Sequence, residues 1–183
     1  MREAYRDKLP KLLLENWEKY GFSAFSKGLF WLTDPEEYHG LMDDYLKGTV
    51  LEGKPHLHVI ARSAFGKLYV WEEHHGLSLE LDFLRHQIYY TPKEILNPSM
   101  ENETMKETLK MIEKQSDVYD EDHQPLFPQA VEKFGILQDD EMYGFVHPLH
   151  LGGENRIENM KKMNLFIHVD IQKNMEIPPV VVV

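Results

Sequence analysis

The chain has 183 residues, of which 42% are hydrophobic, enough to bury the core of one large domain or of two small, closely packed ones. It contains no cysteine, which excludes disulfides, thiolate metal sites and cysteine nucleophiles and favours a reducing compartment. Residues 28–150 carry 10 Lys and Arg against 23 Asp and Glu within a net charge of −11, so direct binding to nucleic acid is disfavoured and a basic partner is favoured.

The N-terminal segment is charged and amphipathic. It lacks the apolar core of a signal peptide, and no apolar run in the chain approaches membrane-spanning length, so we expect a soluble, cytoplasmic protein without a membrane partner. Apolar residues at helical spacing between Leu9 and Tyr20 predict a helix that ends at Gly21. Residues 28–34 then predict a short strand.

The clearest helix signal covers residues 34–46. Asp34 can cap this helix, Pro35 fits its first position, and Glu37 is placed to complete a capping box. The side facing the core is predicted to consist of Tyr38, Leu41, Met42 and Tyr45.

Four β-rich runs follow a loop marked by Gly and Pro. Residues 56–65 and 67–73 predict a hairpin, and residues 77–83 and 87–92 continue as strands, so we expect an antiparallel meander.

The pattern changes at residues 97–103, where Pro, Asn and Ser mark the best candidate boundary. A helix is predicted at about 103–115 and a polar, acidic loop at 116–125. A short helix is predicted at 127–135 and a strand at 142–146.

The last part of the chain is ambiguous. Within residues 157–175 the apolar positions fit both a strand and a helix. The tail, residues 177–183, is either a docked strand or an aggregation-prone end, and we assign it no function.

Ten histidines raise the question of a metal site. The candidate pairs are His56 with His58, His74 with His75 beside Glu72 and Glu73, and His147 with His150. No His-Glu-x-x-His helix and no Gly-x-Ser-x-Gly elbow are present, and Gly152-Gly153 fits a tight turn better than a phosphate loop. We therefore predict no catalytic residue, no metal and no cofactor.

Acidic residues gather between residues 99 and 141, a stretch with twelve Asp and Glu and four Lys. The two interpretations are a solvated face and a docking surface for a basic partner, which opposite charge would attract. Aromatic residues among these acids would supply anchors. The candidate partner-binding residues are Asp117, Tyr119, Asp120, Glu121, Asp122, Phe127, Asp139, Asp140 and Glu141.

Three stretches resemble a known family combination. "LPKLLLENWEKYGFSAFSKGLFWLTDPEEY" (9–38) resembles the opening of the bacterial GAD-like domain, and "VIARSAFGKLYVW" (59–71) resembles its hairpin. "YGFVHPLHLGGENRIENMKKMNLFIHVDI" (143–171) is similar to the C-terminal domain that accompanies it in type VI secretion immunity proteins. The shared aromatic residues and glycines suit core and turn positions, and the family has no established catalytic residues to carry over.

The resemblance implies an immunity protein that binds a toxic effector, in the best-known branch a DNase of the toxin-15 type, and so protects the producing cell. It implies a GAD-like domain over residues 1–96, an immunity-protein C-terminal domain over 97–177, and an apolar tail over 178–183. We expect an α+β fold, an antiparallel sheet with flanking helices in two closely packed subdomains. The partner would be a basic nuclease domain, bound by a monomer in a 1:1 complex.

Two other functions stay open at this stage. One is a metal-dependent hydrolase that uses His56, His58 and a carboxylate, and the other is a sensor domain with an enclosed small-molecule pocket. Two inhibitory mechanisms are also open, because carboxylates can block a DNA cleft and an inserted element can disrupt the fold of the toxin.

Overall fold

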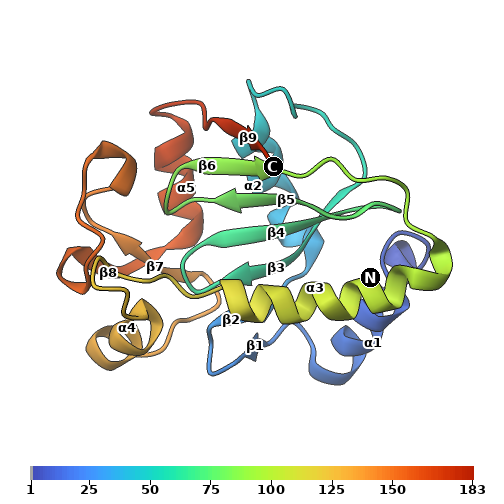
Figure 1. Cartoon of the computed structure of the whole chain (residues 1–183), viewed down its shortest axis with the longest axis horizontal. Coiled ribbons are helices and arrows are strands. Elements are labelled where there is room, and N and C mark those ends of the chain that lie inside the picture. Colours follow the sequence, from blue (N-terminus) through green and yellow to red (C-terminus); the bar gives the residue numbers. More distant parts are fainter. Residues whose placement is uncertain (1) are drawn as a thin grey trace.

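A seven-stranded sheet forms the centre of the computed structural model, which describes residues 2–183 (Figure 1). The strand order is β1-β2-β3-β4-β5-β6-β9, and every neighbouring pair is antiparallel except β6 and β9, which run parallel. The strands are β1 (Ala24–Phe25), β2 (Phe30–Leu32), β3 (Leu57–Ser63), β4 (Lys67–Glu72), β5 (Gly76–Asp82), β6 (Gln87–Tyr90) and β9 (Val180–Val182). The predicted meander is therefore confirmed.

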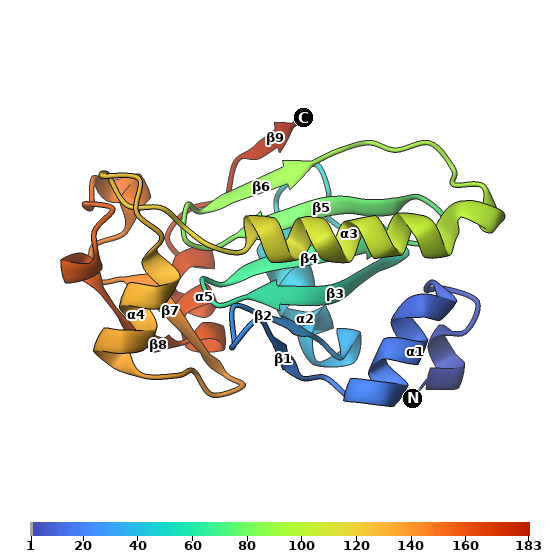
Figure 2. The same ribbon diagram turned by 60° about the horizontal axis from the view of Figure 1, so that its bottom comes forward.

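Helices cover both faces of this sheet (Figures 1 and 2). The helices are α1 (Lys11–Tyr20), α2 (Pro35–Leu46), α3 (Glu101–Gln115), α4 (Leu126–Phe134) and α5 (Leu165–Lys173). α1 and α3 pack on one face and α2 and α5 on the other, while α4 and the hairpin of β7 (Glu141–Phe145) and β8 (Met160–Asn164) lie at one end. Short 3-10 turns span Arg2–Tyr5, Pro98–Met100, Leu149–Leu151 and Ile157–Asn159.

Alternation along the central strand β4 explains the two-sided core. Leu68 and Val70 point to the α2 and α5 side, whereas Tyr69 and Trp71 point to the α1 and α3 side, and all four are fully buried. Residues of α4, α5 and β7 share the first of these cores with α2, so the C-terminal part packs directly on the sheet. The predicted α+β class is confirmed.

The helix predicted at 34–46 is present as α2. The Asp34 carboxylate accepts a hydrogen bond from the Glu36 N–H at 3.1 Å, one residue nearer than in a capping box. Tyr38, Met42 and Tyr45 are buried as predicted.

The ambiguous segment contains both kinds of element. Residues 160–164 form β8, and residues 165–173 form α5. The strand alternative is therefore wrong for residues 165–171. The chain turns from strand to helix at Asn164, because its side-chain oxygen accepts the Ile167 N–H at 3.0 Å and caps α5. The helical side chains Leu165 and Val169 then enter the core.

The apolar tail is a docked strand. Val180, Val181 and Val182 pair with Ile88, Tyr89 and Tyr90, and Figure 1 shows β9 lying along the edge of β6. The pairing covers an edge that would otherwise present free N–H and C=O groups.

The turn between β3 and β4 joins the sheet to the C-terminal part. Gly66 has φ 75°, and a Cβ at that position would lie 2.6 Å from Met142 Cε. A larger residue would therefore be strained by the positive φ and would force the Met142 side chain to move. None of the helices formed by residues 2–183 has the length and apolarity that a membrane crossing requires.

Candidate partner-binding surface

The predicted acidic residues lie in two loops at opposite ends of α4. Residues 117–122 precede this helix and residues 139–141 follow it. Nine helical residues span about 14 Å, so the two groups flank α4 and do not form one cluster.

Asp117 is a half-buried helix cap. Its Oδ1 accepts hydrogen bonds from the Val118 N–H at 2.8 Å and from the Phe127 N–H at 2.9 Å. The second bond satisfies a free N–H in the first turn of α4. Burial raises the pKa of the Asp117 carboxyl, although both hydrogen bonds act in the opposite direction. This side chain therefore serves the fold of the loop.

Asp120 organises the same loop. Its carboxylate accepts the N–H groups of Gln124 at 2.8 Å and Asp122 at 2.9 Å, and the side-chain amide of Gln129 at 3.3 Å. These bonds, that from Gln124 above all, hold the pKa of Asp120 below its ordinary value. Asp120 is therefore committed to internal contacts.

Glu121, Asp122 and Tyr119 face outward. Glu121 forms an exposed ion pair with Arg156 at 2.9 Å, whereas the Asp122 carboxylate is exposed and has no hydrogen-bond partner of its own within residues 2–183. The Tyr119 ring is 53% exposed, and its carbonyl accepts a hydrogen bond from Asn155 at 2.8 Å. In this loop, Asp122 and Tyr119 are the groups most available to a partner.

The second acidic loop is held by basic and amide groups. Asp140 accepts a hydrogen bond from the Asn164 side chain at 2.7 Å, and Glu141 pairs with Lys162 at 3.2 Å. The hydrogen bond from the Gln138 N–H lowers the pKa of the Glu141 carboxyl, and the hydrogen bond from Lys162 adds a smaller effect in the same direction. The Asp139 side chain is exposed, and the Asp139 carbonyl accepts a hydrogen bond from Arg62 at 2.9 Å.

Phe127 is placed in the core. Its side chain is 9% exposed and packs against Tyr143, with 6.3 Å between ring centroids. Position 127 therefore supplies no surface anchor in this conformation. The amphipathic pattern of α4 places it inward, which its acidic neighbours in the sequence concealed.

Arg156 and Lys162 neutralise part of the surface, and sequence analysis missed both. Arg156 follows the Gly152-Gly153 turn, where a Cβ on Gly153 would lie 1.9 Å from the His147 carbonyl oxygen. The tight-turn interpretation of this pair is confirmed, and the turn brings Arg156 beside Glu121.

His58 on β3 and His56, in the bend just before this strand, meet one carboxylate. Glu73 lies between His58 Nε2 at 2.7 Å and His56 Nδ1 at 3.1 Å, so both imidazoles are engaged by the same side chain. Within residues 2–183 no group of three or more His, Asp or Glu is arranged to hold a metal ion. The geometry gives the hydrolase alternative no support.

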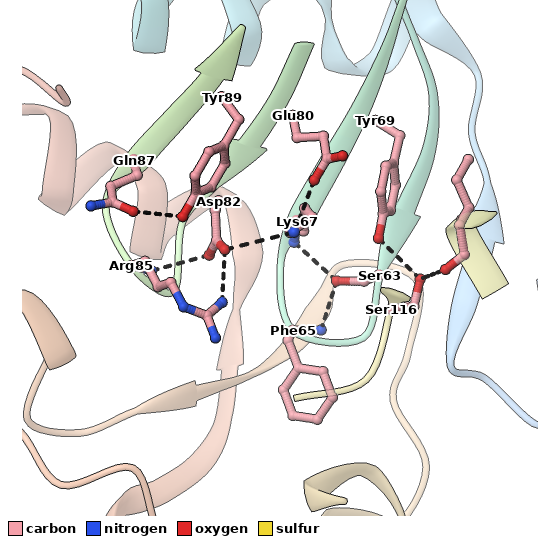
Figure 3. Close-up of polar contacts among 11 residues, drawn as sticks. Ser63, Phe65, Lys67, Tyr69, Glu80, Asp82, Arg85, Gln87, Tyr89 and Ser116 are labelled. Carbon is pink, nitrogen blue, oxygen red and sulfur yellow. Dashed lines mark hydrogen bonds and ion pairs between the residues drawn. The ribbon is translucent and has the colours of Figure 1, made fainter. Parts of the chain in front are cut away.

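Polar residues at the β3–β4 and β5–β6 turns also satisfy one another (Figure 3). Lys67 binds Glu80 at 2.9 Å, Arg85 binds the buried Asp82 at 2.8 Å, and Ser63 Oγ accepts the Lys67 N–H at 3.0 Å. Each group is paired for structure, and none is positioned as a nucleophile with an adjacent base.

The whole fold recurs in a solved structure, "Crystal structure of Atu4351 from Agrobacterium tumefaciens". The two share 23% sequence identity with a TM-score of 0.82, over 96% of this chain and 80% of that one. No curated protein matches the chain.

Two family matches define the class of the chain. Residues 2–85 match the GAD-like domain. Residues 102–176 match the family described as T6SS immunity protein Tdi1, C-terminal, where T6SS is the type VI secretion system. The N-terminal part of the chain is thus similar to a GAD-like domain, and its C-terminal part is similar to a Tdi1-type immunity domain.

Proposed function

We propose that this protein binds and neutralises a cognate type VI secretion effector, and that the effector is a nuclease acting on DNA. The match of residues 102–176 to the Tdi1 immunity family carries this proposal. The protein would act by stoichiometric binding in the cytoplasm, as a monomer in a 1:1 complex, and not by catalysis.

The charge of the molecule supports a nuclease partner. A DNase needs a basic surface to hold DNA, and this chain has a net charge of −11, with 10 Lys and Arg against 23 Asp and Glu in residues 28–150. The exposed carboxylates of Asp122 and Asp139 flank α4 in the immunity domain. They can occupy positions on the effector that phosphates would otherwise fill, and they speed encounter with a basic surface.

Co-expression with the effector encoded beside this protein tests the proposal. Cells that produce the effector alone should lose viability and DNA integrity, and cells that also produce this protein should retain both. The purified pair should elute as one complex. Death of the co-expressing cells, or absence of a complex, would overturn the immunity function, whereas protection without any DNA damage by the effector would overturn its assignment as a DNase.

A further inference from the structure

An open groove runs between α5 and the β7–β8 hairpin in the immunity domain. It has a volume of about 340 Å³, within the size range of sites that accept ligand groups. Its apolar lining includes the exposed side chains Val146, Ile167, Ile171 and Met175.

The apolar side chains form a stripe along one helix face. Ile167, Ile171 and Met175 recur every four residues and are 62%, 56% and 59% exposed, and Val146, 58% exposed, faces them from the end of β7. Contiguous exposed apolar surface of this kind marks an interaction site in a folded protein.

Two buried polar atoms in the groove lack partners. Gln172 is 3% exposed, and its Nε2 donates to the Phe83 carbonyl at 2.9 Å, which directs Oε1 away from that bond. Gln172 Oε1 and His150 Nδ1 have no hydrogen-bond partner among residues 2–183. An unsatisfied buried acceptor is costly, and both atoms belong to residues that line the groove, so the structure carries this cost beside it.

The charge at the rim is basic, although the protein is acidic. Lys161 lines the groove, is exposed, and makes no salt bridge with a carboxylate of residues 2–183. Its charge lies near His168, another lining residue. Asn164 also lines the groove and binds Asp140, so the groove adjoins the second acidic loop.

We propose that this groove is the anchor site for an apolar peptide segment of the effector. A large apolar side chain of that segment would cover Ile167 and Ile171, and an acidic side chain would face Lys161. The proposal rests on the proposed immunity function. It adds the surface that holds the effector and the chemistry of the segment that enters it.

Binding of the purified effector domain, inactivated by substitution and taken from the effector encoded beside this protein, tests the groove. The variant Ile167→Asp/Ile171→Asp should raise the Kd at least about thirtyfold, as central hot-spot residues do, mainly through faster dissociation. Both side chains are exposed, so the thermal melting curve should match that of wild type.

The matched control is Val50→Asp/Ile95→Asp, which changes two side chains that are 86% and 75% exposed outside the groove. It should bind as wild type does. A second variant, Lys161→Glu, should weaken binding about tenfold by opposing the acidic side chain.

The outcomes separate the two proposals. If wild type protects cells and binds the effector, and the Ile167 and Ile171 variant does so equally well, the groove is overturned and the immunity function stands. If wild type neither protects nor binds, the immunity function fails and the groove proposal fails with it. Self-association of wild type that the same variant abolishes, with effector binding intact, would assign the groove to a second copy of this chain and overturn the proposal.

Discussion

Replacement of Arg62 by Met should detach the second acidic loop from the sheet. Arg62 lies on β3 and is 1% exposed, and its guanidinium donates to the carbonyls of Glu141 at 3.0 Å and Asp139 at 2.9 Å. It also stacks on Trp31, 3.9 Å from the ring centroid. One buried cation therefore joins the part of the chain that matches the GAD-like domain to residues 138–141, in the part that matches the Tdi1 family.

The contacts set the size of the effect. Two hydrogen bonds from a charged donor contribute about 1.5 kcal/mol each, and the stacked guanidinium adds about 1 kcal/mol. Burial disfavours the charged guanidinium, and the pKa of Arg62 is lowered for that reason. Removal of the charge by substitution therefore recovers part of the stability that the lost contacts cost. Since Met keeps the apolar stem, we expect Arg62→Met to lower the free energy of unfolding by about 3 kcal/mol.

Urea unfolding followed by tryptophan fluorescence and circular dichroism measures this loss. Trp31 reports directly on the site, since the guanidinium lies over its ring. The control is Arg6→Met, because Arg6 is 71% exposed and its ion pair with Glu3 spans 3.7 Å, so a change under about 0.5 kcal/mol is expected. A loss below about 1 kcal/mol for Arg62→Met would refute the argument that this residue joins the two domains.

Three further predictions follow from the described contacts. Asp122→Lys with Asp139→Lys should slow association with the effector about tenfold at low salt and flatten its salt dependence in stopped-flow measurements, and an unchanged salt slope would reject a role for these carboxylates. Lowering the pH from about 7.5 to 5.5 should reduce the unfolding free energy, because burial lowers the pKa of His58, His86 and His168 and the unfolded chain takes up protons first as the pH falls through about 6.5. Urea curves of the variant with Gln at His86 and His168 should show a smaller loss than wild type, and a loss of the same size would contradict this expectation. Removal of residues 180–183 should cost about 1–2 kcal/mol and expose the β6 edge, so light scattering should detect aggregation, and a stable monomer of the truncated chain would contradict this expectation.

Local signals account for the parts of the fold that the sequence predicted. The helix α2 has its cap, its Pro at the first position and its buried stripe within thirteen consecutive residues. The meander follows from β-rich runs separated by turns, as at Gly66. The change from strand to helix at Asn164 was harder to predict from the sequence. The Met and Ile positions fit both the strand and the helix period, and only the cap marks the boundary.

Long-range contacts explain why the predicted surface was only partly resolved. The sequence places Asp117, Asp120 and Glu121 in a polar loop, but the first two accept backbone N–H groups and the third pairs with Arg156, 35 positions away. Whether a carboxylate is free or already bound depends on the folded loop for Asp117 and Asp120, and on a donor distant in the sequence for Glu121. Composition can therefore predict an acidic surface and cannot select the residues that a partner would reach.

The exposed apolar side chains of α5 could not be predicted from the sequence for a related reason. Ile167 and Ile171 alternate with other apolar residues and so resemble core positions, and only the helical conformation turns them outward. Their exposure gives the C-terminal part of the chain two kinds of surface, carboxylates on either side of α4 and an apolar groove beside α5. Long-range charge acts before contact, whereas apolar burial acts only after it. We therefore expect substitutions at Asp122 and Asp139 to change the association rate and those at Ile167 and Ile171 to change the dissociation rate, so that the two contributions can be measured independently in one complex.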